Sequence, residues 1–436
     1  MAAIDTPPPN TQAHLSPEIH DIIISRLAGD RMALHACSLV CKDWAALTRP
    51  LLFSKLFLND LDGSGPERCR NSLQLFTESP HLVKYIRRVH LGCGELTVHN
   101  DPWDVLEWML SDQLLIMEEF PELLLMLTHV ETLQLLLYDR SLSKLSDHIR
   151  DALLYIIQLP SLHRFYYPGL TKALPPPAQE YPHLQSFLLH CAEKLTDLSV
   201  PLMPQAPSLS ESIAIEPVHH PKLQRLRVEY PYKERPEEII IPITSTQLQS
   251  LRWASTPTID HLLGTFTHRI MPQNLHTLTL TRVFRSDRDH ELKFYPDLTS
   301  CVALRRVEIE ATAVCEENYS DAALWATDCY KQLKTLPTVT SVKFDVKVLK
   351  ILYISYYDAW EYCGWGALDS LVGDMLEEGS LAHAHIKMAW AKYEGPVDLE
   401  DAIAGSGPFA KMLRMTCDHL PRLMASPKAK IELYKL

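Results

Sequence analysis

The sequence predicts an α/β protein in which a three-helix N-terminal module precedes a curved solenoid of αβ repeats with a C-terminal cap. Three observations support this prediction: helical apolar spacing before residue 58, a short strand pattern that recurs between residues 129 and 344, and alternating strand and helix patterns over residues 315–436. Hydrophobic residues make up 46% of the 436 residues and charged residues 22%, which is typical of a folded chain. The length exceeds what one compact core usually supports.

The charge and the N-terminus exclude several classes of protein. The formal net charge is -12 and the basic residues are dispersed, whereas a nucleic-acid binder needs a concentrated positive surface. Residues 1–13 contain three prolines and an acidic residue where a signal peptide would have basic charge and an apolar core, so we expect a disordered tail. No window offers about 18 uncharged apolar residues. With ten scattered cysteines, we expect a cytoplasmic and/or nuclear protein that binds neither nucleic acid nor membrane.

The first expected helix lies in "LSPEIHDIIISRL", residues 15–27. Pro17 suits the first turn of a helix, and Glu18 complements the positive end of the helix dipole. Ile19 and Ile23 are four residues apart and therefore share one face. We expect this face to be apolar.

A second helix is expected to start after Asp30 and to continue through "MALHACSLVCKDWAAL" to Leu47. On one continuous helix, Leu34, Val40 and Trp44 share a core-facing stripe with the two cysteines. Leu39 points in the opposite direction. This second apolar edge predicts a further contact, either with a third helix of the same module or with a partner protein.

Cys37 and Cys41 raise the alternative of a zinc site, since residues four apart on a helix can share a metal ion. Zinc needs four ligands and usually a second matching pair, and the sequence has none. His35 points away from both cysteines on the helical wheel. Burial of both cysteines as small apolar side chains is the favoured interpretation.

These segments, together with "RPLLFSKLFL", resemble the F-box over residues 14–58. The F-box is a three-helix module that binds the Skp-family adaptor of cullin-type (SCF) ubiquitin ligases. The family often has a second proline where this chain has Ser16. The resemblance implies that the Skp-family adaptor binds through the following residues: Leu15, Pro17, Glu18, Ile19, Ile23, Leu39, Val40 and Trp44.

Beyond a linker at residues 59–71, an aliphatic pattern recurs in nine segments, among them "HLQSFLL" and "KLQRLRV". The clearest copies start at Leu223, Leu248, Leu275 and Leu304, at intervals of 25, 27 and 29 residues. These intervals are typical of leucine-rich repeats, which supply one strand of a curved parallel sheet per unit. We therefore predict a leucine-rich-repeat-like solenoid over residues 72–314, followed by αβ repeats and a cap over 315–436. An F-box followed by such an array resembles the fungal F-box proteins.

Strand alternation predicts which side chains face the core of the array. We expect the core to hold Leu226, Val228, Leu251, Trp253, Leu278, Leu280, Val307 and Ile309. The alternate positions form a polar sheet face, on which Arg227 and Arg252 make a basic spot suited to an acidic or phosphorylated segment. Any solvated sheet face has a similar composition, but an extended concave array favours protein recognition. The predicted substrate face contains Arg225, Arg227, Arg252, Thr279, Arg306 and Glu308.

Motifs of catalysis are missing from the sequence: it has no nucleophile elbow, no phosphate-binding glycine loop and no zinc-protease helix. His383 and His385 alternate onto one strand face, but no carboxylate or cysteine lies near them in sequence. Asp104 and Glu107 fit the first turn of a helix. We therefore expect a protein that is not an enzyme and has no cofactor or metal.

The resemblance implies a substrate-recognition adaptor of an SCF ubiquitin ligase, which docks the Skp-family subunit and holds an unknown protein substrate. The alternative is a ligase-independent interaction or scaffolding protein whose F-box-like helices only cap the array.

Overall fold

The computed structural model describes most of the regular elements of the chain. The described residues are 16–58, 64–92, 117–136, 142, 145–167, 177–201, 203–204, 217–229, 239–240, 243–255, 274–284, 301–313, 317–334, 336–348, 364–390, 414 and 416–435. Leu15, the predicted tail, and Asp104 and Glu107 lie outside these ranges.

A single twelve-stranded sheet organises the chain, and every pairing of neighbouring strands in it is parallel. The strands lie side by side in the order in which they occur along the chain. They are β1 (Lys55–Leu58), β2 (Arg88–Leu91), β3 (Thr132–Leu135), β4 (Arg164–Tyr166), β5 (Asp197–Pro201), β8 (Arg225–Glu229), β11 (Ser250–Ser255), β12 (Thr277–Phe284), β13 (Arg306–Ala313), β14 (Ser341–Val348), β15 (His383–Trp390) and β16 (Ala429–Lys435).

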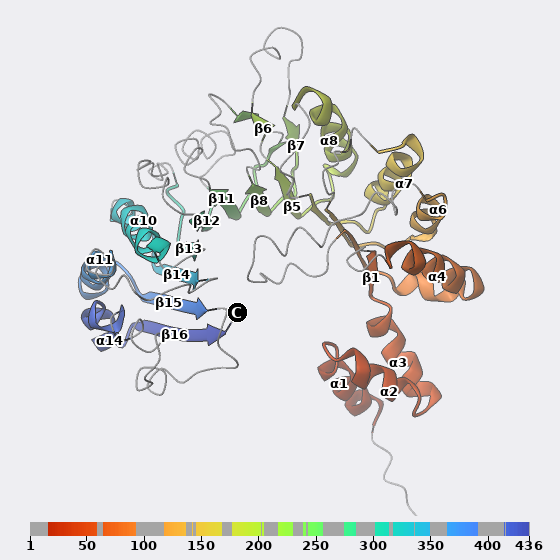
Figure 1. Ribbon diagram of the computed structural model, residues 1–436, viewed down its shortest axis with the longest axis horizontal. Coiled ribbons are helices and arrows are strands. Elements are labelled where there is room, and N and C mark those ends of the chain that lie inside the picture. Colours follow the sequence, from red (N-terminus) through yellow and green to blue (C-terminus); the bar gives the residue numbers. More distant parts are fainter. Residues whose placement is uncertain are drawn as a thin grey trace, which may run out of the picture.

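Helices cover one side of this sheet. They are α4 (Gly65–Glu78), the 3-10 helix η1 (Pro80–Tyr85), α6 (Glu119–Met126), α7 (Asp147–Gln158), α8 (Pro177–Cys191), α10 (Glu317–Leu333), α11 (Trp365–Glu377) and α14 (Pro421–Ala425). The sheet follows an arc, with the strands on its inner side and the helices on its outer side (Figure 1). We call the sheet surface opposite the helices the inner face.

Two small sheets accompany the large one between β5 and β11. β6 (Met203–Pro204) pairs with β9 (Ile239–Ile240) in antiparallel fashion, and β7 (Val218–His219) pairs with β10 (Ile243–Thr244) in parallel.

The core lies between the sheet and its helices. All eight side chains predicted to face the core from β8 to β13 are buried, and so are the four leucines that start the regular repeats. Aligned registers place Leu226, Leu251 and Leu278 directly beside one another. Tyr330 on α10 adds a polar link to the sheet, because its hydroxyl donates to the backbone carbonyl of Lys343 at 2.9 Å. The alternation therefore predicts both faces of this part of the sheet correctly.

The segment "HLQSFLL" is an exception, since it belongs to helix α8 and not to a strand. Its buried residues Leu184, Phe187, Leu188 and Cys191 have the i, i+3, i+4, i+7 spacing of a helix face. Eleven residues separate this copy from the next, which is too short for a repeat unit. The prediction of a strand in this segment was therefore wrong.

Three helices, α1 (Pro17–Arg26), α2 (Arg31–Ser38) and α3 (Lys42–Leu52), form a module at one end of the arc (Figure 1). Only Ile24, Leu34 and Thr48 are fully buried within these helices. Just two residues separate α3 from β1, and the Ser54 carbonyl accepts hydrogen bonds from the backbone N–H groups of Arg87 and Arg88, both at 2.9 Å. The module thus continues directly into the sheet, and residues 55–58, assigned above to the module, form the first strand.

The expected single helix from Asp30 to Leu47 is two helices. α2 ends at Ser38, and Cys41 adopts an extended backbone as the residue that precedes α3. As a result, Val40 and Cys41 are exposed and Cys37 is half-buried, so the predicted burial of both cysteines was wrong. Asp30 caps α2 by accepting a hydrogen bond from the Ala33 N–H at 2.9 Å.

The last helix is held by a buried carboxylate. Asp369 on α11 is almost fully buried, and its two oxygens accept hydrogen bonds from the backbone N–H groups of Arg422 (3.2 Å) and Leu423 (2.8 Å) at the start of α14. The Arg422 side chain then donates to Asp374 at 2.8 Å, which lowers the pKa of that carboxyl group. These contacts fix α14, and with it β16, to α11.

We expect Asp369→Ala to destabilise the C-terminal part of the fold by about 1–3 kcal/mol, because one part-buried and one buried backbone N–H group lose their acceptor. Urea denaturation measures the loss, and hydrogen exchange should show faster exchange in residues 421–435. Ser370→Ala is the matched control, since the exposed Ser370 hydroxyl bonds only within its own helix. Equal stability of the two variants would contradict the role of Asp369.

Candidate functional site

Two surfaces are candidates for function: the exposed apolar side chains of the three-helix module and the polar inner face of the sheet. On the module, five large apolar side chains are exposed, and the least covered are Met32 at 79% and Leu39 at 75%. We call this set the apolar surface of the module; it consists of Ile19, Ile22, Met32, Leu39 and Val40. A module of three short helices with so few buried residues has much of its apolar area available for contact.

The residues predicted to dock a partner occupy different environments. Pro17 and Glu18 are exposed at the start of α1, where the backbone N–H of Glu18 and the Ser16 hydroxyl lower the pKa of the Glu18 carboxyl group. Ile23 is half-buried, and Trp44 is half-buried with its ring 5.5 Å from that of His20. Sequence reasoning missed Ile22 and Met32, although Ile22 lies three residues after Ile19 on the same side of α1.

The inner face is ordered into rows because the strand registers are aligned. Row 1 takes the first position of each strand, and row 3 takes the third position. From β4 to β13, row 1 contains Arg164, Asp197, Arg225, Ser250, Thr277 and Arg306. Row 3 contains Tyr166, Ser199, Arg227, Arg252, Thr279 and Glu308. All six residues of the predicted substrate face lie in these two rows.

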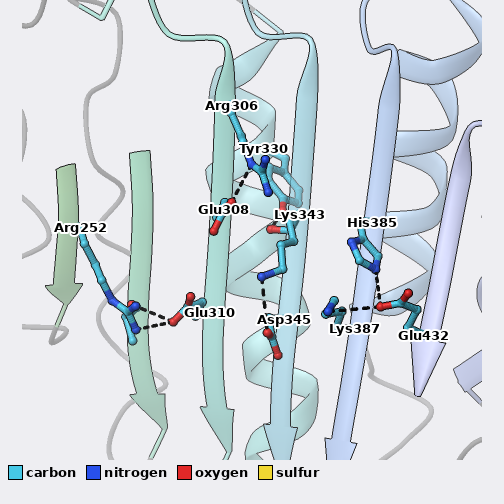
Figure 2. Close-up of polar contacts among 11 residues, drawn as sticks. Arg252, Arg306, Glu308, Glu310, Tyr330, Lys343, Asp345, His385, Lys387 and Glu432 are labelled. Carbon is cyan, nitrogen blue, oxygen red and sulfur yellow. Dashed lines mark hydrogen bonds and ion pairs between the residues drawn. The ribbon is translucent and has the colours of Figure 1, made fainter. Parts of the chain in front are cut away.

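Ion pairs occupy the inner face from β11 onwards (Figure 2). Arg252 reaches past β12 to Glu310 on β13, with a nitrogen–oxygen distance of 2.5 Å. Arg306 pairs with Glu308 at 2.6 Å, and Lys343 pairs with Asp345 at 3.7 Å. Arg227 and Arg252 are neighbours, as predicted, but Glu310 neutralises Arg252. The pair therefore does not form the doubly charged basic spot that the sequence suggests.

At the far end of the sheet, Glu432 on β16 gathers three basic groups. His385 lies 2.9 Å from its carboxylate, Lys387 lies 3.2 Å away, and Lys430 makes a third contact. The hydrogen bonds from these three groups lower the pKa of the Glu432 carboxyl group to about 2, and the one from Lys430 contributes most. Sequence reasoning missed this carboxylate as a neighbour of His385, since 47 residues separate them.

Upstream, Asp197 on β5 collects arginines from both neighbouring strands. Arg225 on β8 donates to it at 2.9 Å, and Arg164 on β4 lies 3.6 Å away. Tyr166 lies beside this group. The pKa of the Tyr166 phenol is raised, mainly by burial and to a smaller extent by the negative charge of Asp197. The phenol therefore stays protonated at neutral pH and can donate a hydrogen bond.

Within the described ranges, no three histidine, cysteine or acidic side chains are placed to hold a metal ion. The described helices include none with both the length and the apolar character needed to cross a membrane. No protein-family model matches the sequence, and a search of curated proteins finds no significant similarity. The two surfaces themselves are therefore the features of the molecule that bear on its function.

Proposed function

We propose that the protein is a non-catalytic substrate-recognition adaptor of a cullin-type ubiquitin ligase. In this proposal the three-helix module is an F-box that docks a Skp-family subunit, and the sheet is a leucine-rich-repeat-like solenoid whose inner face holds a protein substrate. The observation that carries the proposal is the apolar surface of the module, on helices that continue directly into the sheet.

The module supports docking because its exposed side chains are of the kind that a partner buries. Leu39 and Val40 lie at the break between α2 and α3, where both are more than half exposed. Fully burying one such side chain contributes about 1.5–3 kcal/mol. A cap that only closed the end of the sheet would present its apolar side chains to the sheet and not to solvent.

The sheet supports recognition through its topology. Strands that follow one another in the chain also neighbour one another in space, which is the arrangement of stacked repeats. The helices lie on the outer side of the arc, and the polar inner face lies on the opposite side of the sheet (Figure 1). A polar face of this kind can contact a protein partner through hydrogen bonds and complementary charges.

The test is a pull-down of the full chain with a purified Skp-family adaptor. We expect the unmodified chain to bind and the double variant Pro17→Ala, Leu39→Asp to lose roughly tenfold or more in affinity, because a charge is placed in an apolar contact. Circular dichroism of both proteins checks that the variant is folded.

Leu189→Asp is the matched control, because Leu189 is an equally apolar, exposed residue on α8, far along the chain from the module. We expect it to bind the adaptor as the unmodified chain does. Lack of binding by the unmodified chain removes the ligase role and leaves the alternative of a scaffolding protein whose helices cap the array.

A further inference from the structure

β16 forms one edge of the twelve-stranded sheet, at the end opposite β1 and the three-helix module (Figure 1). It pairs with β15 on one side, and no described strand lies along its other side. An edge strand presents backbone N–H and C=O groups that can pair with a strand of another molecule, and proteins often protect such edges with prolines or very short strands. β16 has seven residues and no proline, whereas β1 at the other edge has four residues.

The pairing with β15 determines which backbone groups of β16 point outward. The Ala384 N–H donates to the Lys428 carbonyl at 3.1 Å. In a parallel ladder every second residue of a strand bonds to the same neighbour, so Lys430 and Glu432 also direct their N–H and C=O groups to β15. The backbone groups of Ile431 and Leu433 therefore point to the outer edge, with the spacing of an ordinary ladder.

The charges of β16 select one way of pairing two copies in antiparallel fashion. A two-fold axis at Ile431 makes a hydrogen-bonded Ile431 pair and places Lys430 of each copy opposite Glu432 of the other. An axis at Lys430 or at Glu432 places that residue opposite itself, and an axis one residue before Lys430 places it opposite Lys428. An axis two residues after Ile431 brings no two charges together. Because unlike charges across a strand pair stabilise it and like charges destabilise it, the axis at Ile431 is favoured.

Apolar side chains on the helix side of this edge also gain from a second copy. Ile431 packs against the core but is half-buried, although Ile386, its register neighbour on β15, is only 3% exposed. The two Ile431 side chains would lie beside each other at the axis and cover this area. Met424, on the helix α14 that packs against β16, is 44% exposed. The axis is perpendicular to the sheet, so the α14 helices of both copies would lie on the same side of it.

We propose that two copies of the chain form a symmetric dimer by antiparallel pairing of their β16 strands, with Ile431 on the two-fold axis and Lys430 of one copy opposite Glu432 of the other. A second copy is the occupant of this edge because its charge pattern is complementary to itself. The two sheets become one, and each module lies at a far end of it. This inference is independent of the proposed function, since it uses only the edge of the sheet.

Analytical ultracentrifugation of the full chain over a range of concentrations tests the proposal. We expect the unmodified chain to form dimers that dissociate on dilution. Lys430→Glu and Glu432→Lys should each weaken dimerisation roughly tenfold or more, because each places like charges opposite each other twice. An equimolar mixture of these two variants should form the heterodimer, since every charge pair across the axis is then of opposite sign.

Lys222→Glu is the matched control, because it makes the same change of charge at an exposed lysine that precedes β8, away from this edge. We expect it to dimerise as the unmodified chain does. Circular dichroism checks that all variants are folded.

Ile431→Cys gives a second measurement that does not depend on the charge variants. Residues in a hydrogen-bonded antiparallel pair have Cα atoms about 5.5 Å apart, which is within the range of a disulfide. Diamide, which takes up the two thiol hydrogens as the disulfide forms, should therefore link two copies covalently. The unmodified chain, treated in the same way, is the control for the other cysteines.

An unmodified chain that is monomeric at every concentration would overturn the proposal, and so would unchanged dimerisation of both charge variants. Charge variants that are monomeric alone and do not associate when mixed would contradict the register. Absence of a disulfide-linked dimer of Ile431→Cys would contradict the position of the axis. Binding of the Skp-family adaptor uses the other end of the chain, so these results stand apart from the test of the proposed function.

Discussion

Replacement of Trp253 by alanine should destabilise the protein by about 3–5 kcal/mol, the largest effect we expect of any single substitution in the sheet. Trp253 is fully buried on β11, with Val228 and Leu280 beside it in register on the two neighbouring strands. Alanine would leave a cavity in the layer between sheet and helices, and close-packed neighbours can fill it only in part. Urea denaturation followed by circular dichroism measures the change.

The control for Trp253 is Ser250→Ala on the same strand. Ser250 is half-buried on the inner face, and we expect its replacement to change stability by less than about 0.5 kcal/mol. Trp253→Phe should give an intermediate loss. Equal effects of Trp253→Ala and Ser250→Ala on stability would contradict the assignment of one buried face and one polar face to β11.

Acidification should destabilise the protein through His220, which follows β7 and is fully buried. Burial lowers the pKa of His220 from 6.5 to about 4. Between these values the unfolded chain binds a proton at this residue and the folded chain does not, so the free energy of unfolding falls as the pH drops from 6.5 to 4. The loss amounts to about 3 kcal/mol and levels off below pH 4, where both states are protonated.

Denaturation at several pH values tests this expectation with His220→Leu. The variant should lose the His220 contribution and show a smaller decline between pH 6.5 and 4 than the unmodified chain, while carboxylates contribute equally to both. His219→Leu is the matched control, since His219 is adjacent and exposed and lowers the pKa of His220 less than burial does. This variant should retain most of the decline. A decline of the same size in His220→Leu would show that other groups are responsible.

The sheet could be predicted from the sequence because its signals are local. Alternation with a period of two specifies the faces of a strand, and leucines 25–29 residues apart specify the repeat, so the core positions from Leu226 to Ile309 are confirmed. The same apolar residues mislead where two periods fit equally well. "HLQSFLL" satisfies both a strand and a helix pattern, and helix α8 is the outcome because Leu184, Phe187 and Leu188 can then be buried together.

The candidate site was less predictable because its contacts join residues that are distant in the chain. Asp197 and Arg225 are 28 residues apart and meet only because β5 and β8 pair in one particular register. Arg252 and Glu310 are 58 residues apart and face each other across an intervening strand. The sequence indicates which residues are polar, but the strand pairing determines which charges cancel.

The junction at Ser54 has a mechanical consequence. A flexible linker would let a bound protein sample many orientations relative to the three-helix module, but here α3 passes into β1 within two residues and backbone hydrogen bonds from Arg87 and Arg88 hold the turn. A protein bound on the inner face is therefore held at one distance and angle from whatever binds the module. For the proposed ligase, lysines on the correct side of the substrate would come within reach of ubiquitin transfer, and lysines on the opposite side would not.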